Sequence, residues 1–300
     1  MNTKVNLAGV ELKNPVMTAS GTFGSGMEYS EFVNLNRLGA VVTKGVANVP
    51  WPGNPTPRIA ETYGGMINAI GLQNPGIDVF CERDIPFLQK YDTKIIVNVC
   101  GKSEKDYLDV VERLSDEPVD MLEINISCPN VKEGGIAFGQ CASNIEHITS
   151  AIKKIAKQPV IMKLSPNVTD ITEMARAAEA GGADILSLIN TITGMKIDIN
   201  RQTFAVANKT GGLSGPAVKP VAVRMVYQVA NAVKVPIIGM GGIATAEDAL
   251  EFILAGATAV SIGTANFHNP RATLDVIEGI EKYMIQKGVN DINDLIGIVK

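Results

Sequence analysis

The chain has 300 residues, of which 46% are hydrophobic and 19% charged, and its formal net charge is −4. This composition excludes a disordered chain, and the lack of any run of lysine and arginine argues against a nucleic-acid partner. The N-terminus has no signal-peptide pattern and no stretch approaches 18 consecutive apolar residues, so we expect a cytoplasmic protein that does not bind a membrane.

Eight short apolar runs, rich in valine and isoleucine, alternate along the chain with segments of helical pattern. Such runs are typical of buried parallel strands. They lie at 15–20, 40–45, 95–100, 121–127, 159–165, 183–190, 236–242 and 259–265. Eight strands that alternate with helices predict an α/β fold, and they favour a closed (β/α)8 TIM barrel over an open doubly wound sheet. No linker-like segment interrupts the pattern, so residues 1–300 are expected to form a single domain.

Two of the predicted helices carry recognisable starts. Ser143 with Glu146 predicts a capping box for a helix over about 144–157. Thr245 with Asp248 predicts a looser cap for the helix that follows it.

Three long inserts, at 46–77, 129–142 and 191–215, each follow a predicted strand. In a barrel of this kind, the segments that follow strands lie at the C-terminal mouth, where the chemistry takes place. We therefore expect the insertions to shape a site at the mouth.

Polar side chains stand near the C-terminal ends of five of the strands. They are Lys44, Asn98, Asn125, Lys163 and Asn190. A strand-end asparagine alone often caps a turn, and a strand-end lysine alone often meets a carboxylate. Because an unpaired buried polar group costs about 1–3 kcal/mol, five such residues together predict a ligand site. Lysines offer positive charge and asparagines offer donors and acceptors, which suits a ligand with an anionic group and an amide-like ring.

Glycines end the last two strands, as Gly241-Gly242 and Gly263-Thr264. Glycine lets the backbone approach a phosphate, and barrels often bind phosphate at the loops after strands seven and eight. Residues 239–244 also fit the G-x-G-x-x-A dinucleotide pattern. The next strand supplies no acidic residue, so a Rossmann-type NAD site is not expected here.

The cysteines and histidines narrow the chemistry. No C-x-x-C pair occurs, so neither a metal site nor an iron–sulfur cluster is predicted. Cys128 follows the fourth run at the mouth, where it could be a tuned acid or base as readily as a structural residue. Cys81 and Cys100 are typical of packing. His147 and His268 lie outside the inserts and are expected to be structural, which argues against a histidine-based hydrolase.

Several motifs together resemble one family along almost the whole chain. The two most specific are N-A-I-G-L-Q-N-P-G at 68–76 and N-I-S-C-P-N at 125–130. The others lie at 19–24, 43–45, 53–55, 57–58, 190–191, 213–216, 241–242 and 263–264. With these motifs the chain resembles the catalytic subunit of class 1 dihydroorotate dehydrogenases, flavoenzymes that oxidise dihydroorotate to orotate in pyrimidine (UMP) biosynthesis.

The resemblance implies roles for specific residues. Cys128 would be the catalytic base. FMN would be held by Ser20, Lys44, Gly45, Asn98, Asn125, Lys163, Ile189, Gly215, Gly241, Gly242, Gly263 and Thr264. Substrate would be held by Lys44, Asn68, Ala69, Ile70, Gly71, Leu72, Asn125, Asn190 and Thr191. No metal is implied.

Within class 1, the motifs are similar to the 1B type. That type passes electrons to NAD+ through a second subunit that carries FAD and a [2Fe–2S] cluster, with two catalytic and two partner subunits in a heterotetramer. The alternatives are the fumarate-dependent 1A type and a dihydropyrimidine dehydrogenase acting on a substrate without a carboxylate. A non-catalytic barrel that only serves assembly would have no use for Cys128 or the strand-end lysines.

Overall fold

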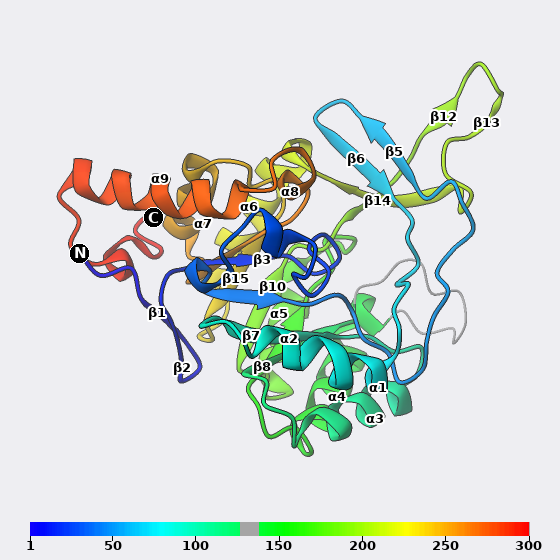
Figure 1. Ribbon diagram of the computed structural model, residues 1–300, viewed down its shortest axis with the longest axis horizontal. Helices are drawn as coiled ribbons and strands as arrows, with labels where there is room; N and C mark the ends of the chain where they lie inside the picture. Colours follow the sequence, from blue (N-terminus) through cyan, green and yellow to red (C-terminus); the bar gives the residue numbers. More distant parts are fainter. Residues whose placement is uncertain (127–137, 300) are drawn as a thin grey trace.

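Eight parallel strands close into a barrel at the centre of the molecule (Figure 1). The computed structural model describes residues 1–126 and 138–299. The barrel strands are β3 Val16–Thr18, β4 Ala40–Val42, β7 Lys94–Val99, β8 Met121–Asn125, β9 Val160–Lys163, β10 Ile185–Leu188, β15 Ile237–Met240 and β16 Ala259–Ile262. Each strand pairs with its successor, and β16 pairs with β3 to close the ring. Seven lie within the predicted apolar runs and β7 begins one residue before its run, so the expected fold class is confirmed.

Helices surround the barrel. The longer ones are α3 Glu104–Leu114, α4 Ala142–Lys153, α5 Ile171–Ala180, α6 Lys219–Ala230, α7 Ala246–Ala255 and α9 Ala272–Lys287. The shorter ones are α1 Ile77–Val79, α2 Ile85–Leu88 and α8 Ala265–His268, with a π-helical turn at Phe80–Asp84 between the first two. Single 3-10 turns lie at Tyr29–Glu31, Leu35–Arg37, Phe138–Gln140, Pro216–Val218 and Ile292–Leu295. The apolar faces of the helices pack on the outside of the strands in one large core. None of the helices in the described ranges is long and apolar enough to cross a bilayer.

The two predicted caps have different outcomes. At the start of α7, the Asp248 N–H donates to Thr245 Oγ1 at 3.3 Å, and the Thr245 N–H donates to Asp248 Oδ2 at 2.9 Å. This reciprocal box confirms the prediction. The predicted Ser143 box is wrong, because α4 begins at Ala142 with Cys141 as its N-cap residue. An N-cap residue needs a non-helical backbone, and Ser143 already lies inside the first turn.

Two of the inserts pair with each other above the barrel mouth. Strands β5 Ile59–Thr62, β6 Gly65–Asn68, β11 Ile192–Met195 and β14 Thr210–Ser214 form an antiparallel sheet in the order β11-β14-β6-β5. In Figure 1 this sheet stands at the end of the molecule away from both termini. It continues into a small hairpin of β12 Ile197–Asp198 and β13 Thr203–Phe204, and another hairpin, β1 Val5–Leu7 with β2 Val10–Leu12, precedes the barrel. The expectation that these inserts lie at the mouth is confirmed, whereas most of the 129–142 insert lies outside the described residues.

Candidate active site

A cavity of about 1100 Å³ lies between the barrel mouth and the insert sheet. Its floor is made by strand ends, which supply Asn98 from β7, Asn125 from β8 and Lys163 from β9. Its roof includes Asn68 of β6 and Ser214 of β14. Small-molecule sites usually measure about 300–1000 Å³, so this one has room for more than a single small ring.

Most of the residues predicted for cofactor and substrate line this cavity. They are Ser20, Lys44, Gly45, Asn68, Ile70, Gly71, Leu72, Asn98, Asn125, Lys163, Ile189, Asn190, Thr191, Gly215, Gly241, Gly242, Gly263 and Thr264. Cys128 lies outside the described residues. Ala69 is the exception among the described ones, because its side chain is buried with Ile67 and Val206 behind the cavity wall. Its backbone N–H donates to the Arg58 carbonyl at 2.7 Å, which ties the Asn68–Leu72 segment to the preceding loop.

Three asparagines on the floor form a row of amides that all point the same way. The Asn98 side chain donates to Glu123 Oε2 at 2.6 Å. Asn125 Nδ2 lies at a longer 3.5 Å from Asn98 Oδ1, and Asn190 Nδ2 donates to Asn125 Oδ1 at 3.3 Å. The row ends where the Thr191 N–H donates to Asn190 Oδ1 at 2.7 Å. Each amide therefore donates toward Glu123.

A buried ion pair lies at the start of this row. Lys163 and Glu123 are 4% and 1% exposed, and Lys163 Nζ lies 3.5 Å from Glu123 Oε2. Lys163 also donates to Ser20 Oγ at 3.0 Å, and Ser187 Oγ donates to Glu123 Oε1 at 2.9 Å. Buried charges are tolerated when they are paired and hydrogen-bonded in this way.

Sequence reasoning missed Glu123. The signal was available, because Glu123 and Asn125 are two apart in a strand and so face the same side of it. An acidic residue in the middle of a buried apolar run is as unusual as the lysines and asparagines at the strand ends.

Lys44 supplies a second positive charge to the cavity. It follows β4, and its backbone N–H donates to the Gly24 carbonyl at 2.9 Å. A Cβ built on Gly21 would lie 3.9 Å from Lys44 Nζ, so the ammonium group lies beside the loop that follows β3. With Lys163, it makes this part of the cavity suitable for anionic groups.

Part of the cavity lining is glycine backbone. Gly242 has φ +83°, and a Cβ there would lie 2.8 Å from the Gly215 carbonyl oxygen and 2.8 Å from Lys219 Cβ. Only glycine fits such a close approach of two chain segments. Thr264 Oγ1 donates to Ser214 Oγ at 2.7 Å and thereby joins the end of β16 to the roof.

Some lining residues were not predicted from the sequence. They include Glu61, Met66, Ser214, Phe267 and His268. His268, expected to be structural, is the last residue of α8 and lies exposed at the rim. The glutamate, methionine and serine come from the insert sheet, whose strands are partly exposed and carry no continuous apolar run. His147, by contrast, lies on α4 with its Nε2 3.0 Å from Glu104 Oε2.

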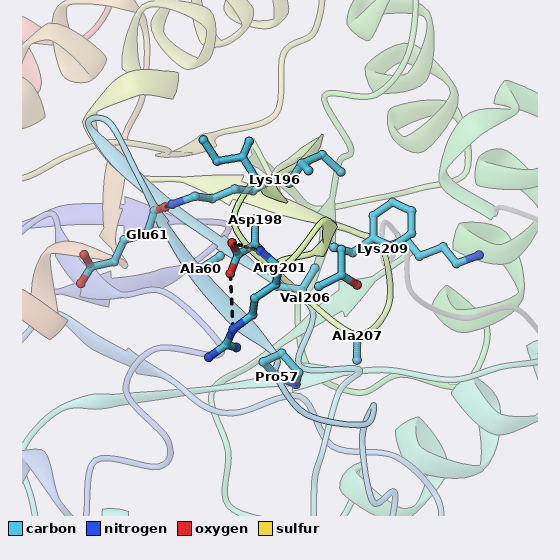
Figure 2. Close-up of a pocket in the computed structure, with 14 residues that line it drawn as sticks. Pro57, Ala60, Glu61, Lys196, Asp198, Arg201, Val206, Ala207 and Lys209 are labelled. Atoms are coloured by element: carbon cyan, nitrogen blue, oxygen red, sulfur yellow. Dashed lines mark hydrogen bonds and ion pairs between the residues drawn. The ribbon is translucent and has the colours of Figure 1, made fainter.

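A second cavity, of about 650 Å³, lies within the inserts alone (Figure 2). Lys196 and Asp198 line one part of it and Pro57 and Ala207 another. Arg201 and Asp198 both line it, with Arg201 Nε 3.8 Å from Asp198 Oδ2. No barrel strand end and no residue predicted for cofactor or substrate contributes to its described lining. The cavity at the barrel mouth is therefore the candidate active site.

None of the described cysteines lines the mouth cavity. Burial, followed by the nearby Glu117 carboxylate, raises the pKa of the Cys81 thiol to about 11. Cys100 packs with Ala47 and Trp51, and Cys141 is exposed. Among residues 1–126 and 138–299, no group of three or more histidine, cysteine, aspartate or glutamate side chains is placed to hold a metal ion.

The comparisons with known proteins agree with one another. A family model described as dihydroorotate dehydrogenase matches residues 2–284. The chain is 76% identical over 300 residues to the "Dihydroorotate dehydrogenase B (NAD(+)), catalytic subunit" of Lachnoclostridium phytofermentans, covering 100% of both chains. Proteins with the same name from Alkaliphilus metalliredigens and Thermoanaerobacter pseudethanolicus are 67% identical over 297 residues and 55% identical over 300, and at least 98% of each chain is covered.

One solved structure extends the comparison to three dimensions. The crystal structure of the dihydroorotate dehydrogenase of Eimeria tenella in complex with ferulenol superposes with a TM-score of 0.83 at 25% identity. The match covers 99% of this chain and 88% of that one.

Proposed function

The chain belongs to the dihydroorotate dehydrogenase family, and from this premise we propose that it oxidises dihydroorotate to orotate in pyrimidine biosynthesis as the catalytic subunit of the NAD+-linked, type 1B enzyme. The observation that carries the proposal is the mouth cavity, where two lysines and three asparagines from separate strand ends converge. The NAD+-linked type is favoured over the fumarate-dependent one because the relatives described above are named as NAD(+) enzymes and match this chain over almost their full length.

FMN is the cofactor that we propose for this cavity. The glycine backbones at Gly215 and Gly242 fit a phosphate, and the floor around Asn98 and Lys163 fits a polar ring that gains negative charge. We propose that it is held by Ser20, Lys44, Gly45, Asn98, Asn125, Lys163, Ile189, Gly215, Gly241, Gly242, Gly263 and Thr264. When bound, FMN supplies an acceptor for the hydride that leaves C6 of dihydroorotate.

We propose that the substrate lies between the floor and the roof of the same cavity. Lys44 would bind its carboxylate, and Asn68, Asn125 and Asn190 would match the donors and acceptors of its ring. The supporting residues would be Ile70, Gly71, Leu72 and Thr191, with Ala69 acting through the backbone of its segment. Such binding orients the ring so that the proton and the hydride leave in a fixed geometry.

Cys128 is our candidate for the catalytic base. It lies outside the described residues, so its support is the N-I-S-C-P-N motif and the fact that only three positions separate it from Asn125, which lines the cavity. The C5 proton of dihydroorotate lies beside a carbonyl and is weakly acidic. A thiolate at this position would remove that proton as the hydride departs from C6.

We further propose that a partner subunit completes the enzyme. The name "catalytic subunit" carried by the relatives implies a second chain. That subunit would carry FAD and a [2Fe–2S] cluster, and two of each chain would form a heterotetramer in the cytoplasm. The absence of an NAD site from the sequence pattern of this chain supports that division of labour.

The test is to purify the chain and look for a non-covalent yellow chromophore that dihydroorotate bleaches without oxygen. A parallel assay with a dihydropyrimidine that lacks the carboxylate separates the alternative substrate. Colourless protein after reconstitution with FMN, or bleaching only by the carboxylate-free substrate, would overturn the proposal.

A further inference from the structure

We propose that Glu123 is a positioning residue, which fixes the direction of the asparagine row and offsets the charge of Lys163 from beneath the cavity. This inference rests on the proposed function, because it concerns how that site is prepared for flavin and substrate. Glu123 itself does not contribute to the described lining of the cavity. It therefore acts through the residues that do.

The carboxylate is contacted from three other strands of the barrel. Asn98 of β7 and Ser187 of β10 donate to its two oxygens, and Lys163 of β9 approaches to 3.5 Å. Glu123 is only 1% exposed, so all of these contacts are made away from water. A buried hydrogen bond is stronger than one at the surface, and leaving a buried polar group unpaired costs more stability.

The direction of the row follows from the chemistry of a carboxylate. An ionised carboxylate only accepts hydrogen bonds, whereas an amide can turn either its oxygen or its nitrogen toward a neighbour. Beside Glu123, Asn98 must present Nδ2, and its Oδ1 then faces Asn125. The same choice passes to Asn190, which presents Nδ2 to Asn125 and Oδ1 to the Thr191 N–H. One buried charge thus decides which atoms of the row remain for the substrate.

The same carboxylate partly offsets the positive charge that Lys163 presents to the proposed cofactor. Lys163 lines the cavity and is 4% exposed, so its positive charge acts on a bound flavin with little screening. A cation stabilises the negative charge of reduced flavin, and a carboxylate at 3.5 Å from that cation reduces the effect. Removing each charge should therefore shift the flavin potential in opposite directions.

Glu123→Gln tests the charge while it preserves the shape. A glutamine can still accept from Asn98 through Oε1 and can donate to Ser187 Oγ through Nε2, so the row keeps its direction. We expect the midpoint potential of bound FMN to become more positive in Glu123→Gln and more negative in Lys163→Met. The control is Glu278→Gln, which removes an exposed glutamate on α9 whose Oε1 lies 2.7 Å from Arg37 Nη1, and which should leave the potential unchanged.

Glu123→Leu tests the direction of the row. Without the acceptor, the Asn98 amide can turn, so the atoms that the row presents to a ligand are no longer fixed. We expect orotate binding to weaken by about tenfold. Glu123→Gln should bind orotate within a few-fold of the parent chain. If Glu123→Leu fails to fold, the potential of Glu123→Gln decides the matter alone.

An unchanged or more negative potential in Glu123→Gln with full flavin content would overturn the inference. So would loss of flavin from Glu123→Gln under conditions where Lys163→Met retains it, because Glu123 would then be needed for flavin to bind at all rather than to set the charge around it. If the parent chain itself takes up no flavin, the proposed function fails instead. The two failures are therefore distinguishable.

Discussion

Gly242 is required at the cavity edge for two separate reasons, and substitution can tell them apart. Its φ of +83° is left-handed, and a Cβ there would lie 2.8 Å from the Gly215 carbonyl oxygen. Gly288, the C-cap of α9, has a similar φ of +67° with nothing within 4 Å of a built Cβ.

We therefore expect Gly288→Ala to lower the free energy of unfolding by about 1–2 kcal/mol, the usual cost of the left-handed conformation. Gly242→Ala should lower it further and should also lose bound flavin, because the two chain segments must separate. Denaturant unfolding and flavin content measure the two effects. Equal stability losses with flavin retained in both variants would refute the close approach.

Cys128→Ala tests the proposed base. Removing a positioned base usually costs 10²–10⁴-fold in rate, so we expect flavin reduction by dihydroorotate to slow by about that factor. Because a free thiol has a pKa near 8.5, the parent rate should rise through mildly alkaline pH. Anaerobic stopped-flow absorbance measures both. Cys141→Ser is the control, and its flavin should be reduced at the parent rate. If the flavin of Cys128→Ala were reduced as fast as that of the parent, Cys128 would not be the base.

The described thiols should differ sharply in reactivity. Hydrogen bonding from the Ser143 hydroxyl, 3.2 Å away, lowers the pKa of the exposed Cys141 thiol, whereas burial raises that of Cys81 to about 11. A lower pKa means more thiolate at neutral pH, and thiolate is the reactive form. Alkylation at pH 7 followed by peptide mass spectrometry should label Cys141 before Cys81. Ser143→Ala should slow the Cys141 reaction, and unaltered labelling there would contradict the hydrogen-bond explanation.

At this scale the sequence was informative where residue type conflicted with its surroundings. Lys163 and Asn125 could be predicted because polar side chains are unusual at the end of apolar runs, and both line the cavity. Glu123 carried the same signal and was overlooked. Ala69 directly follows Asn68, the last residue of β6, and its side chain is buried while that of Asn68 lines the cavity, a difference between neighbours that a motif match does not distinguish.

At the scale of elements, α4 and α7 provide a matched pair of helix starts. Thr245 forms a reciprocal capping box, whereas Ser143 lies inside the first turn. We expect Thr245→Ala to lower the free energy of unfolding by about 0.5–2 kcal/mol, and Ser143→Ala to change it by less than about 0.5 kcal/mol. Chemical denaturation of both variants measures the difference. Equal losses would show that α4 uses a cap after all.

The barrel strands could be predicted and the insert sheet could not. Burial on both faces leaves a long apolar signature in each barrel strand, as in β7, where all but the first residue is buried. The strands of the insert sheet are partly exposed, and β6 pairs with β14, so that Asn68 faces Gly212. A pairing over that distance in sequence leaves no local pattern to read.

At the scale of the whole molecule, one core joins the chain from end to end. It includes Val5 of the first hairpin and Leu295 of the last 3-10 turn, and Asn2 bridges to Asp291. This continuity supports our proposal that residues 1–300 form one domain.

The proposed division of labour between subunits gives a prediction at the same scale. The chain alone should have its flavin reduced by dihydroorotate but should not reduce NAD+, and adding the FAD and [2Fe–2S] subunit should restore NADH formation. Absorbance at the NADH band measures this, with fumarate as the competing acceptor. NADH formation by the chain alone, or turnover with fumarate, would point to a different type of enzyme.

The antiparallel pairing of β6 with β14 has a consequence for how the protein is made. The residues that line the cavity are spread along the chain. Ser20 comes early in the sequence, Ser214 belongs to the roof, and Gly263 and Thr264 come late. At about 5–20 residues per second, roughly 7–30 s of translation separate β6 from β14. A ribosome-bound chain therefore has no complete pocket to fill until nearly all of it has emerged. The proposed cofactor could therefore bind only after most of the chain has been made, which places its uptake after translation rather than during it.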